Sequence, residues 1–359
     1  MRFLLRWTNA VPVVALLALA ATWSAKPGPL VLAAVGLLLA GSVLAAVHHA
    51  EVVAHRVGEP FGSLVLAVAV TVIEVALIVT LMLSGGPETA TLARDTVFAA
   101  VMITCNGIVG LSLLVGTVKG GTASFNAEGT ATALATVATL ATLSLVFPTF
   151  TTSRPGGEFS PAQLAFAAVS SLALYGLFVF VQTFRHRDYF LPPEDEKGHA
   201  EEHVPPPSNR KAAISLGMLL VALIAVVGLA KIESPAIEAA VAAMGAPHSA
   251  VGVVIALLVI LPETLAAVRN ARRNRIQVSF NLALGSAMAS IGLTIPVLAV
   301  ASVWLEGPLA LGLAPTQIVL LAITSIVAGL TVLPGRATVQ EGGVHLVLFG
   351  AFLFLAFNP

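Results

Sequence analysis

The stretch that decides the fold is Phe61–Leu83, which reads FGSLVLAVAVTVIEVALIVTLML. It is long and apolar enough to cross a bilayer as one α-helix, since a spanning helix needs about 20 mostly apolar residues. Its one charged residue is Glu74, near the centre. An ionised carboxylate at that depth costs at least about 2.5 kcal/mol, so an acidic side chain there indicates a function.

A second stretch carries the same feature in the other half of the chain. Ser249–Arg269 reads SAVGVVIALLVILPETLAAVR and holds Glu263. The proline directly before this glutamate removes a backbone donor and frees a carbonyl one turn earlier, near Leu258 or Val259. In a membrane such a carbonyl is tolerated only where it is buried in protein or lines a cavity, and there it can serve as an oxygen ligand.

The composition places the chain among membrane proteins. Of its 359 residues, 57% are hydrophobic and only 10% are charged, with a mean hydropathy of +0.96, whereas soluble domains are about 25% charged. We therefore expect an all-α polytopic membrane protein whose main partner is the lipid bilayer. The net charge of zero gives no case for a nucleic-acid partner. The single cysteine, Cys105, excludes an intramolecular disulfide.

About eleven transmembrane helices are expected from the apolar runs. The candidate spans are Ala10–Ser24, Pro29–Val47, Phe61–Leu83, Asp95–Thr117, Ala127–Phe147, Pro161–Phe184, Lys211–Ala230, Ser249–Arg269, Val278–Trp304, Pro315–Leu333 and Gly342–Phe357.

The basic residues predict the orientation of these spans. With the N-terminus in the cytoplasm, alternation places 14 of the 18 Lys and Arg residues inside. Such an excess is the asymmetry that the positive-inside rule describes. It predicts a cytoplasmic N-terminus and, after eleven spans, a C-terminus outside. The four basic residues left outside are Lys26, Arg94, Arg154 and Lys231.

A hydrophilic stretch divides the chain into two similar halves. We predict an N-terminal transmembrane helix at 1–27, a first five-helix repeat at 28–184, a cytoplasmic acidic linker at 185–210 and a second five-helix repeat at 211–359. Because five is odd, the second repeat enters the membrane with the opposite orientation. Inverted repeats of this kind are typical of secondary transporters.

Short signals recur in both halves in the same order. A Gly-x-Pro precedes the glutamate span, an Asn-x-x-x-Gly lies in the next span, and a hydroxyl residue follows it. They are Gly58-Glu59-Pro60, Asn106–Gly110 and Ser112 in the first half, and Gly245-Ala246-Pro247, Asn281–Gly285 and Ser286 in the second.

These patterns predict one cation- and proton-binding site formed by both glutamates. The candidate supporting ligands are Thr71, Asn106, Ser112, Thr264, Asn281 and Ser286. An all-oxygen site suits Ca²⁺, which takes six to eight oxygen ligands, and it also suits Na⁺ or K⁺. Beyond Cys105 the spans offer nothing soft for Zn²⁺ or Cu⁺. No cofactor is expected; the cation and H⁺ are cargo.

The expected mechanism is exchange by alternating access. Burial and a nearby like charge both favour the protonated form of a carboxyl, so the two glutamates should carry protons when no cation is bound. A divalent cation would displace both protons, and the empty, doubly charged state is penalised. The alternative is a cation channel or uniporter without proton coupling. An enzyme is not expected, since the spans hold no His-Glu-x-x-His motif or comparable catalytic set.

The segments around the two glutamates resemble those of a known group. Gly58–Gly62 leading to Glu74, and Leu261-Pro262-Glu263 leading to Asn281–Ser286, are similar to the bacterial calcium/proton antiporters of the cation/calcium exchanger superfamily. The resemblance implies ten core helices in two inverted repeats plus an N-terminal helix, placement in the bacterial inner membrane, and essential glutamates at Glu74 and Glu263.

The chain departs from that group's common signature, Gly-Asn-Ala-x-Glu, in both halves. The matching stretches are Val70–Glu74 and Val259–Glu263, and the histidine often found after the second glutamate is Thr264. This resembles the sodium-potassium/proton or calcium/proton antiporter branch. The substitutions bear on selectivity for Ca²⁺ more than on proton coupling, which needs only the carboxyls.

Other polar groups are assigned simpler roles. His48, Glu51 and His55 share a helix face, which permits metal binding, but we favour a solvated helix end. Glu128, which could gate ion access, is likewise expected to be solvated at the interface. The acidic residues of the linker, Glu194–Glu202, could sense Ca²⁺ or pH, but a solvated charge run is preferred.

Overall fold

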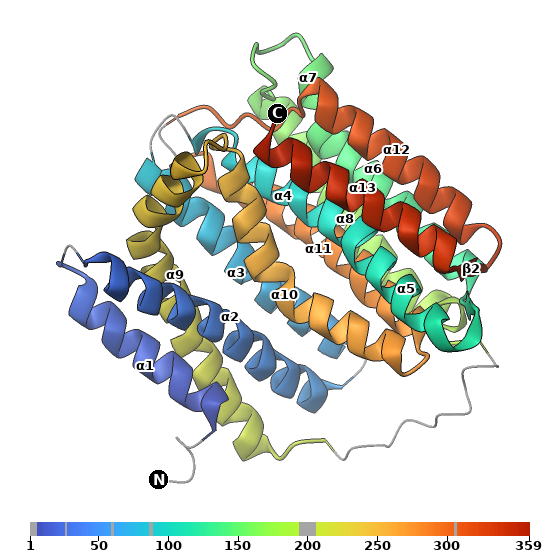
Figure 1. Cartoon of the computed structure of the whole chain (residues 1–359), viewed down its shortest axis with the longest axis horizontal. Coiled ribbons are helices and arrows are strands. Elements are labelled where there is room, and N and C mark those ends of the chain that lie inside the picture. Colours follow the sequence, from blue (N-terminus) through green and yellow to red (C-terminus); the bar gives the residue numbers. More distant parts are fainter. Residues whose placement is uncertain (1–5, 26, 59–60, 86–88, 194–205, 305–306) are drawn as a thin grey trace.

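The computed structural model describes residues 6–25, 27–58, 61–85, 89–193, 206–304 and 307–359, which form a nearly all-helical bundle (Figure 1). The α-helices are α1 (Trp7–Thr22), α2 (Pro29–Val57), α3 (Phe61–Gly85), α4 (Leu92–Met102), α5 (Val109–Gly120), α6 (Ala127–Ala141), α7 (Phe147–Phe150), α8 (Pro161–Phe180), α9 (Asn209–Ala243), α10 (Ala250–Arg272), α11 (Ile276–Ala301), α12 (Pro315–Val332) and α13 (Val339–Phe357). The π-helical segments are η2 (Ile103–Ile108), η3 (Thr142–Val146) and η4 (Val181–Arg185); η5 (Arg187–Phe190) is a 3₁₀ turn, and β1 (Thr122–Ser124) and β2 (Arg336–Thr338) are short strands.

Among the described residues, ten helical segments are long and apolar enough to cross a membrane, and α1 is a shorter apolar helix. Together they correspond to the eleven expected spans, so the all-α polytopic fold is confirmed. Large apolar side chains such as Leu30, Leu37 and Val347 are exposed on the outside of the bundle. Contiguous apolar surface of this kind marks contact with lipid, and the chain is an integral membrane protein.

Two helices continue well beyond their predicted ends. Helix α2 runs to Val57 rather than Val47, and α9 runs to Ala243 rather than Ala230. The 35 residues of α9 extend over about 52 Å at 1.5 Å per residue, against a hydrocarbon core of about 30 Å. The hydropathy signal stops where polar residues begin, whereas backbone hydrogen bonding continues into the aqueous layer.

Three spans of the first half are composite, which the apolar pattern did not indicate. Span four is α4, η2 and α5; span five is α6, η3 and α7; and span six is α8 followed by η4. A π-helical turn is wider than an α-helical one and often marks a functional site.

The inverted repeat is visible in how the connections pair. Strand β1, between spans four and five, is antiparallel to β2, between spans ten and eleven. Glu158, between spans five and six, forms an antiparallel bridge with Ala310, between spans nine and ten. If spans two to six are exchanged with spans seven to eleven in order, the first pairing takes the place of the second. Figure 1 shows β2 at the lower right and α7, which leads to Glu158, at the top, so the two pairings lie at opposite ends of the bundle.

The helix contacts follow the same exchange of halves. Helix α3 packs on α11, and α10 packs on span four; α8 packs on α11, and α13 packs on α5 and η2. Helices α1, α2 and α9 pack together at one edge (Figure 1). There the imidazole of His49 hydrogen-bonds the backbone oxygen of Thr8, with 3.0 Å between Nε2 and O.

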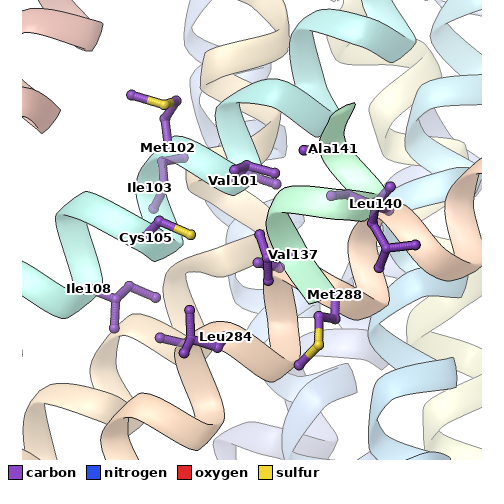
Figure 2. Close-up of a cluster of buried hydrophobic side chains, with 14 of the residues drawn as sticks. Val101, Met102, Ile103, Cys105, Ile108, Val137, Leu140, Ala141, Leu284 and Met288 are labelled. Carbon is purple, nitrogen blue, oxygen red and sulfur yellow. The ribbon is translucent and has the colours of Figure 1, made fainter. Parts of the chain in front are cut away.

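The interior of the bundle is filled around span four. Figure 2 shows apolar side chains of span four, from Val101 to Ile108, together with Val137 and Leu140 of α6 and Leu284 and Met288 of α11 in one buried cluster. Those of span four are Val101, Met102, Ile103, Cys105 and Ile108. Close packing of this kind leaves side chains few alternative positions. This packing therefore fixes the positions of span four and α11, and with them the polar side chains that the two helices carry.

Candidate cation site

Both glutamates line one cavity of about 150 Å³ in the centre of the bundle. Its walls come from α3, from α8 and η4, from α10 and from α11. The polar side chains around it are Thr71, Glu74, Tyr175, Gln182, Glu263, Asn281, Ser286 and Ser290. The structure brings both predicted glutamates to one cavity; that they form one cation site stays a prediction.

Glu74 sits on α3 with only 4% of its surface exposed. Its Oε1 accepts a hydrogen bond from the hydroxyl of Ser290 on α11, with 2.6 Å between the oxygens. A short hydroxyl–carboxyl bond of this kind is strong, and it fixes the carboxyl against the facing helix.

Glu263 sits on α10 and is 8% exposed. Its Oε2 is buried and has no hydrogen-bond partner among the described residues. Two other carboxyls, Glu51 and Glu74, act on it electrostatically. A buried acceptor left without a partner costs about 1–3 kcal/mol, and more when charged, so this oxygen is available for a proton or a cation.

Three predicted supporting residues also reach the cavity, namely Thr71, Asn281 and Ser286. The side-chain amide of Asn281 donates from Nδ2 to the backbone oxygen of Phe190 at 2.6 Å, and its Oδ1 accepts from Gln277 at 2.9 Å. Asn281 therefore ties α11 to the turn η5 at one end of the cavity.

The other three predicted supporting residues are engaged away from the cavity. Asn106 donates to Thr324 on α12 at 2.9 Å. The hydroxyl of Ser112 lies 2.6 Å from that of Ser279. Thr264 returns its hydrogen bond to the backbone oxygen of Ile260, on its own helix, at 2.9 Å. None of the three is among the cavity-lining residues, so we do not propose them as ligands of the cation.

Ser290 is the site residue that the motif comparison missed. Asn106 lies in the middle of span four, whereas Asn281 lies in the second turn of α11, so the shared Asn-x-x-x-Gly pattern does not mark equivalent depths. Counted from Leu92 and Ile276, the first residues of the two spans, the equivalent of Asn106 is Ser290. Alignment by span start would have found it.

The cavity extends from the glutamates toward one end of the bundle. Leu66 near the start of α3, Asn281 near the start of α11 and Gln182 in η4 all line it. This is the end where α10 terminates with Arg269 and Arg272 in its last turn. It is also the end that the basic residues predict to be cytoplasmic.

The Gly-x-Pro signal before the first glutamate span lies partly outside the described residues. Glu59 and Pro60 of the first signal, and the acidic stretch 194–205 of the linker, are not described. Within the described residues, no group of three or more His, Cys, Asp or Glu side chains is arranged to hold a metal ion. The possible metal site at His48, Glu51 and His55 therefore gains no support.

Loss of the Ser290 hydroxyl should weaken transport without unfolding the protein. Ser290→Ala removes the one hydrogen bond to Glu74 that the structure shows. A bond to a carboxylate contributes about 1.5–3 kcal/mol, so we expect a ten- to hundred-fold loss in the ratio of maximal rate to half-saturating cation concentration, measured in proteoliposomes. Ser302→Ala is the matched control, because Ser302 directly follows the same helix and its hydroxyl donates only to the backbone oxygen of Ala299. Equal effects of the two substitutions would contradict the assignment.

Comparison with known proteins places this architecture in one family. The model of the family described as sodium/calcium exchanger protein matches residues 27–184 and 214–358. The putative ionic transporter y4hA of Sinorhizobium fredii is 47% identical over 98% of this chain and 96% of its own length. The sodium-potassium/proton antiporter ChaA of Escherichia coli is 35% identical over 96% of this chain and 94% of its own.

The fold is shared with solved structures of low sequence identity. The structure of YfkE covers 98% of this chain and 99% of its own at a TM-score of 0.73 and 16% identity. That of the H⁺/Ca²⁺ exchanger CAX covers 99% and 92%, with a TM-score of 0.71 and 16% identity. Together with the family match, which spans both halves and their glutamates, this shows that the chain belongs to the sodium/calcium exchanger protein family.

Proposed function

We propose that this protein is a secondary active antiporter that exports Ca²⁺, and also Na⁺ or K⁺, in exchange for H⁺. The observation that carries the proposal is that Glu74 and Glu263, from opposite halves of the chain, are buried in the wall of one cavity. The names of similar proteins support both cargoes, since ChaA is a sodium-potassium/proton antiporter and CAX is an H⁺/Ca²⁺ exchanger.

Oxygen ligands for a cation are available around the cavity. The two carboxylates provide up to four oxygens, and the hydroxyls of Thr71, Ser286 and Ser290 line the same space. Ca²⁺ is bound by six to eight oxygens, usually with some from water. Na⁺ and K⁺ can use the same oxygens, so the chemistry of the lining alone does not favour one of the three.

Coupling to protons follows from burial. Two carboxylates in one dry cavity repel each other and lose their hydration, so the charged, empty site is the least stable state. Two protons or one divalent cation restore neutrality. The same oxygens cannot bind the protons and the cation together. A change of access while the site is empty and charged is penalised in free energy. Exchange is therefore stoichiometric, and protons compete with the cation for the site.

Alternating access is supported by the asymmetry between the two ends. The cavity leads toward the arginine-rich end of α10. Toward the other end, the described lining of the cavity stops at Glu74 on α3 and at Ser290 on α11. The inverted repeats allow the two halves to exchange these roles. We further propose that the N-terminus is cytoplasmic, the C-terminus is outside and the membrane is the bacterial inner membrane.

A proteoliposome assay tests the function directly. The purified protein is reconstituted with a pH-sensitive dye in the lumen, and Ca²⁺, Na⁺ or K⁺ is added outside in separate runs. We expect the lumen to become alkaline as cation enters, at a rate that saturates with cation concentration and falls as the outside is acidified. Cation uptake without a change in lumenal pH would instead indicate a channel or uniporter.

A further inference from the structure

A second buried polar network lies beside the cation site. Asn106 on η2 is fully buried, and its Oδ1 lies 3.1 Å from Nδ1 of His345 on α13, itself fully buried. The other ring nitrogen of His345 lies 3.1 Å from the hydroxyl of Thr331, and Nδ2 of Asn106 donates to Thr324 at 2.9 Å. A histidine in the middle of a membrane protein usually has a function, and the exchange mechanism above does not use this one.

The hydrogens in this network can be assigned from the chemistry of the partners. An amide oxygen only accepts, so Nδ1 of His345 donates to Asn106. In the neutral ring Nε2 then accepts, and Thr331 donates to it. Both polar atoms of the Asn106 amide are thus occupied by residues of α12 and α13.

Asn106 nevertheless lies at the depth of Glu263 on a neighbouring helix. Near one end of the bundle, a Cβ on Gly252 of α10 would meet Thr96 of α4 at 2.8 Å; near the other, one on Gly116 of α5 would lie 3.8 Å from the backbone oxygen of Ala271. The two spans therefore run parallel and in contact. Glu263 and Asn106 lie about midway between these two contacts, each roughly 15 Å along its helix at 1.5 Å per residue.

The pair equivalent to Glu263 and Asn106 is Glu74 and Ser290, and it is hydrogen-bonded. On the parallel helices α3 and α11, Glu74 accepts a hydrogen bond from Ser290, and Ser290 is the position equivalent to Asn106. By the exchange of halves, the partner of Glu263 should be Asn106. In this structure Oε2 of Glu263 has no partner among the described residues, while the Asn106 amide is turned to His345.

We propose that His345 is a positioning residue that holds the Asn106 amide away from Glu263 in the state described, and releases it to Glu263 when the cavity opens to the opposite side. The π-helical turn that carries Asn106 allows this change, because its conversion to an α-helical turn rotates the residues within it about the helix axis. The proposal rests on the antiport function above. It identifies the residue that sets whether the Asn106 amide is available to Glu263.

Removing His345 should raise the affinity for the cation and slow turnover. His345→Leu frees Asn106 and increases the fraction of molecules with a complete site, which lowers the apparent dissociation constant. We expect the Ca²⁺ concentration for half-maximal exchange to fall roughly three- to ten-fold, as for loss of one hydrogen bond, together with a lower maximal rate. His345→Asn keeps a donor near the position of Nδ1 and should restore the parental values.

A double-mutant cycle separates positioning from a structural cross-link. If His345 acts through Asn106, the variant carrying Asn106→Ala and His345→Leu should match Asn106→Ala alone. Ser325→Ala is the control on α12, since its hydroxyl bonds only within its own helix. Multiplying effects, or an unchanged Ca²⁺ dependence with a lowered melting temperature in His345→Leu, would overturn the proposal.

A binding measurement keeps this test distinct from the test of antiport. The Ca²⁺-induced rise in melting temperature is followed for the same variants in detergent at one fixed pH, where there is no membrane and no transport. Parental vesicles without proton-coupled flux would refute the proposed function alone. A Ca²⁺ response that is the same for the parent, His345→Leu and Asn106→Ala would refute the role of His345.

Discussion

Replacing either Glu74 or Glu263 by glutamine abolishes proton-coupled exchange, with an expected loss of at least about 100-fold, equivalent to some 2.7 kcal/mol. A glutamine can neither release a proton nor neutralise a divalent cation. The rate of lumenal alkalinisation in proteoliposomes measures the loss. Glu128→Gln should leave the rate unchanged, because Glu128 lies exposed at the start of α6 and does not line the cavity.

The two substitutions should differ in their effect on stability. In Glu74→Gln the amide oxygen can still accept the hydrogen bond from Ser290, so the melting temperature should remain close to that of the parent. In Glu263→Gln a neutral amide replaces a carboxyl whose Oε2 has no partner among the described residues and which lies near two other carboxyls, so the melting temperature should rise. Full cation flux coupled to ΔpH in either variant would refute the shared-site mechanism.

Gly252→Ala is expected to be strongly damaging although it adds only one methyl group. An added Cβ would lie 2.8 Å from the backbone nitrogen of Thr96 and 3.0 Å from the carbonyl carbon of Asp95. Backbone atoms cannot move aside as the end of a side chain can, so α10 must separate from α4. Overpacking costs about 1–3 kcal/mol, and it displaces the helix that carries Glu263.

The expected result is a lower melting temperature and slower exchange. Thermal unfolding in detergent and the rate of lumenal alkalinisation in proteoliposomes measure the two effects. Gly217→Ala on α9 is the matched control, since a Cβ there meets no atom within 4 Å, and alanine is at least as favourable as glycine in a helix. Equal behaviour of the two variants would show that the close approach at Gly252 is not needed for stability or exchange.

Prediction from sequence succeeded where the signal is local to one segment. Apolar length located the spans, and the charge of Glu74 and Glu263 stood out against it. It failed where the outcome depends on rotation of a helix about its axis. Asn106 and Asn281 share a five-residue pattern, yet one faces α13 and the other the cavity. When the connections before two spans differ in length, a shared short motif does not show how deep its asparagine lies in the membrane or which neighbouring helix it faces.

The amino-acid sequence by itself determined a membrane protein of about eleven spans in two inverted halves, each with a glutamate in the middle of an apolar span. Hydropathy, proline and charge act within a segment, and a bilayer allows few conformations and environments for such a segment. Only the tertiary structure decided which neutral groups accompany the carboxyls: Ser290 pairs with Glu74, whereas Asn106 is held by His345. Those partners lie more than 200 residues apart in sequence, and π-helical turns and connection lengths set how their helices face each other.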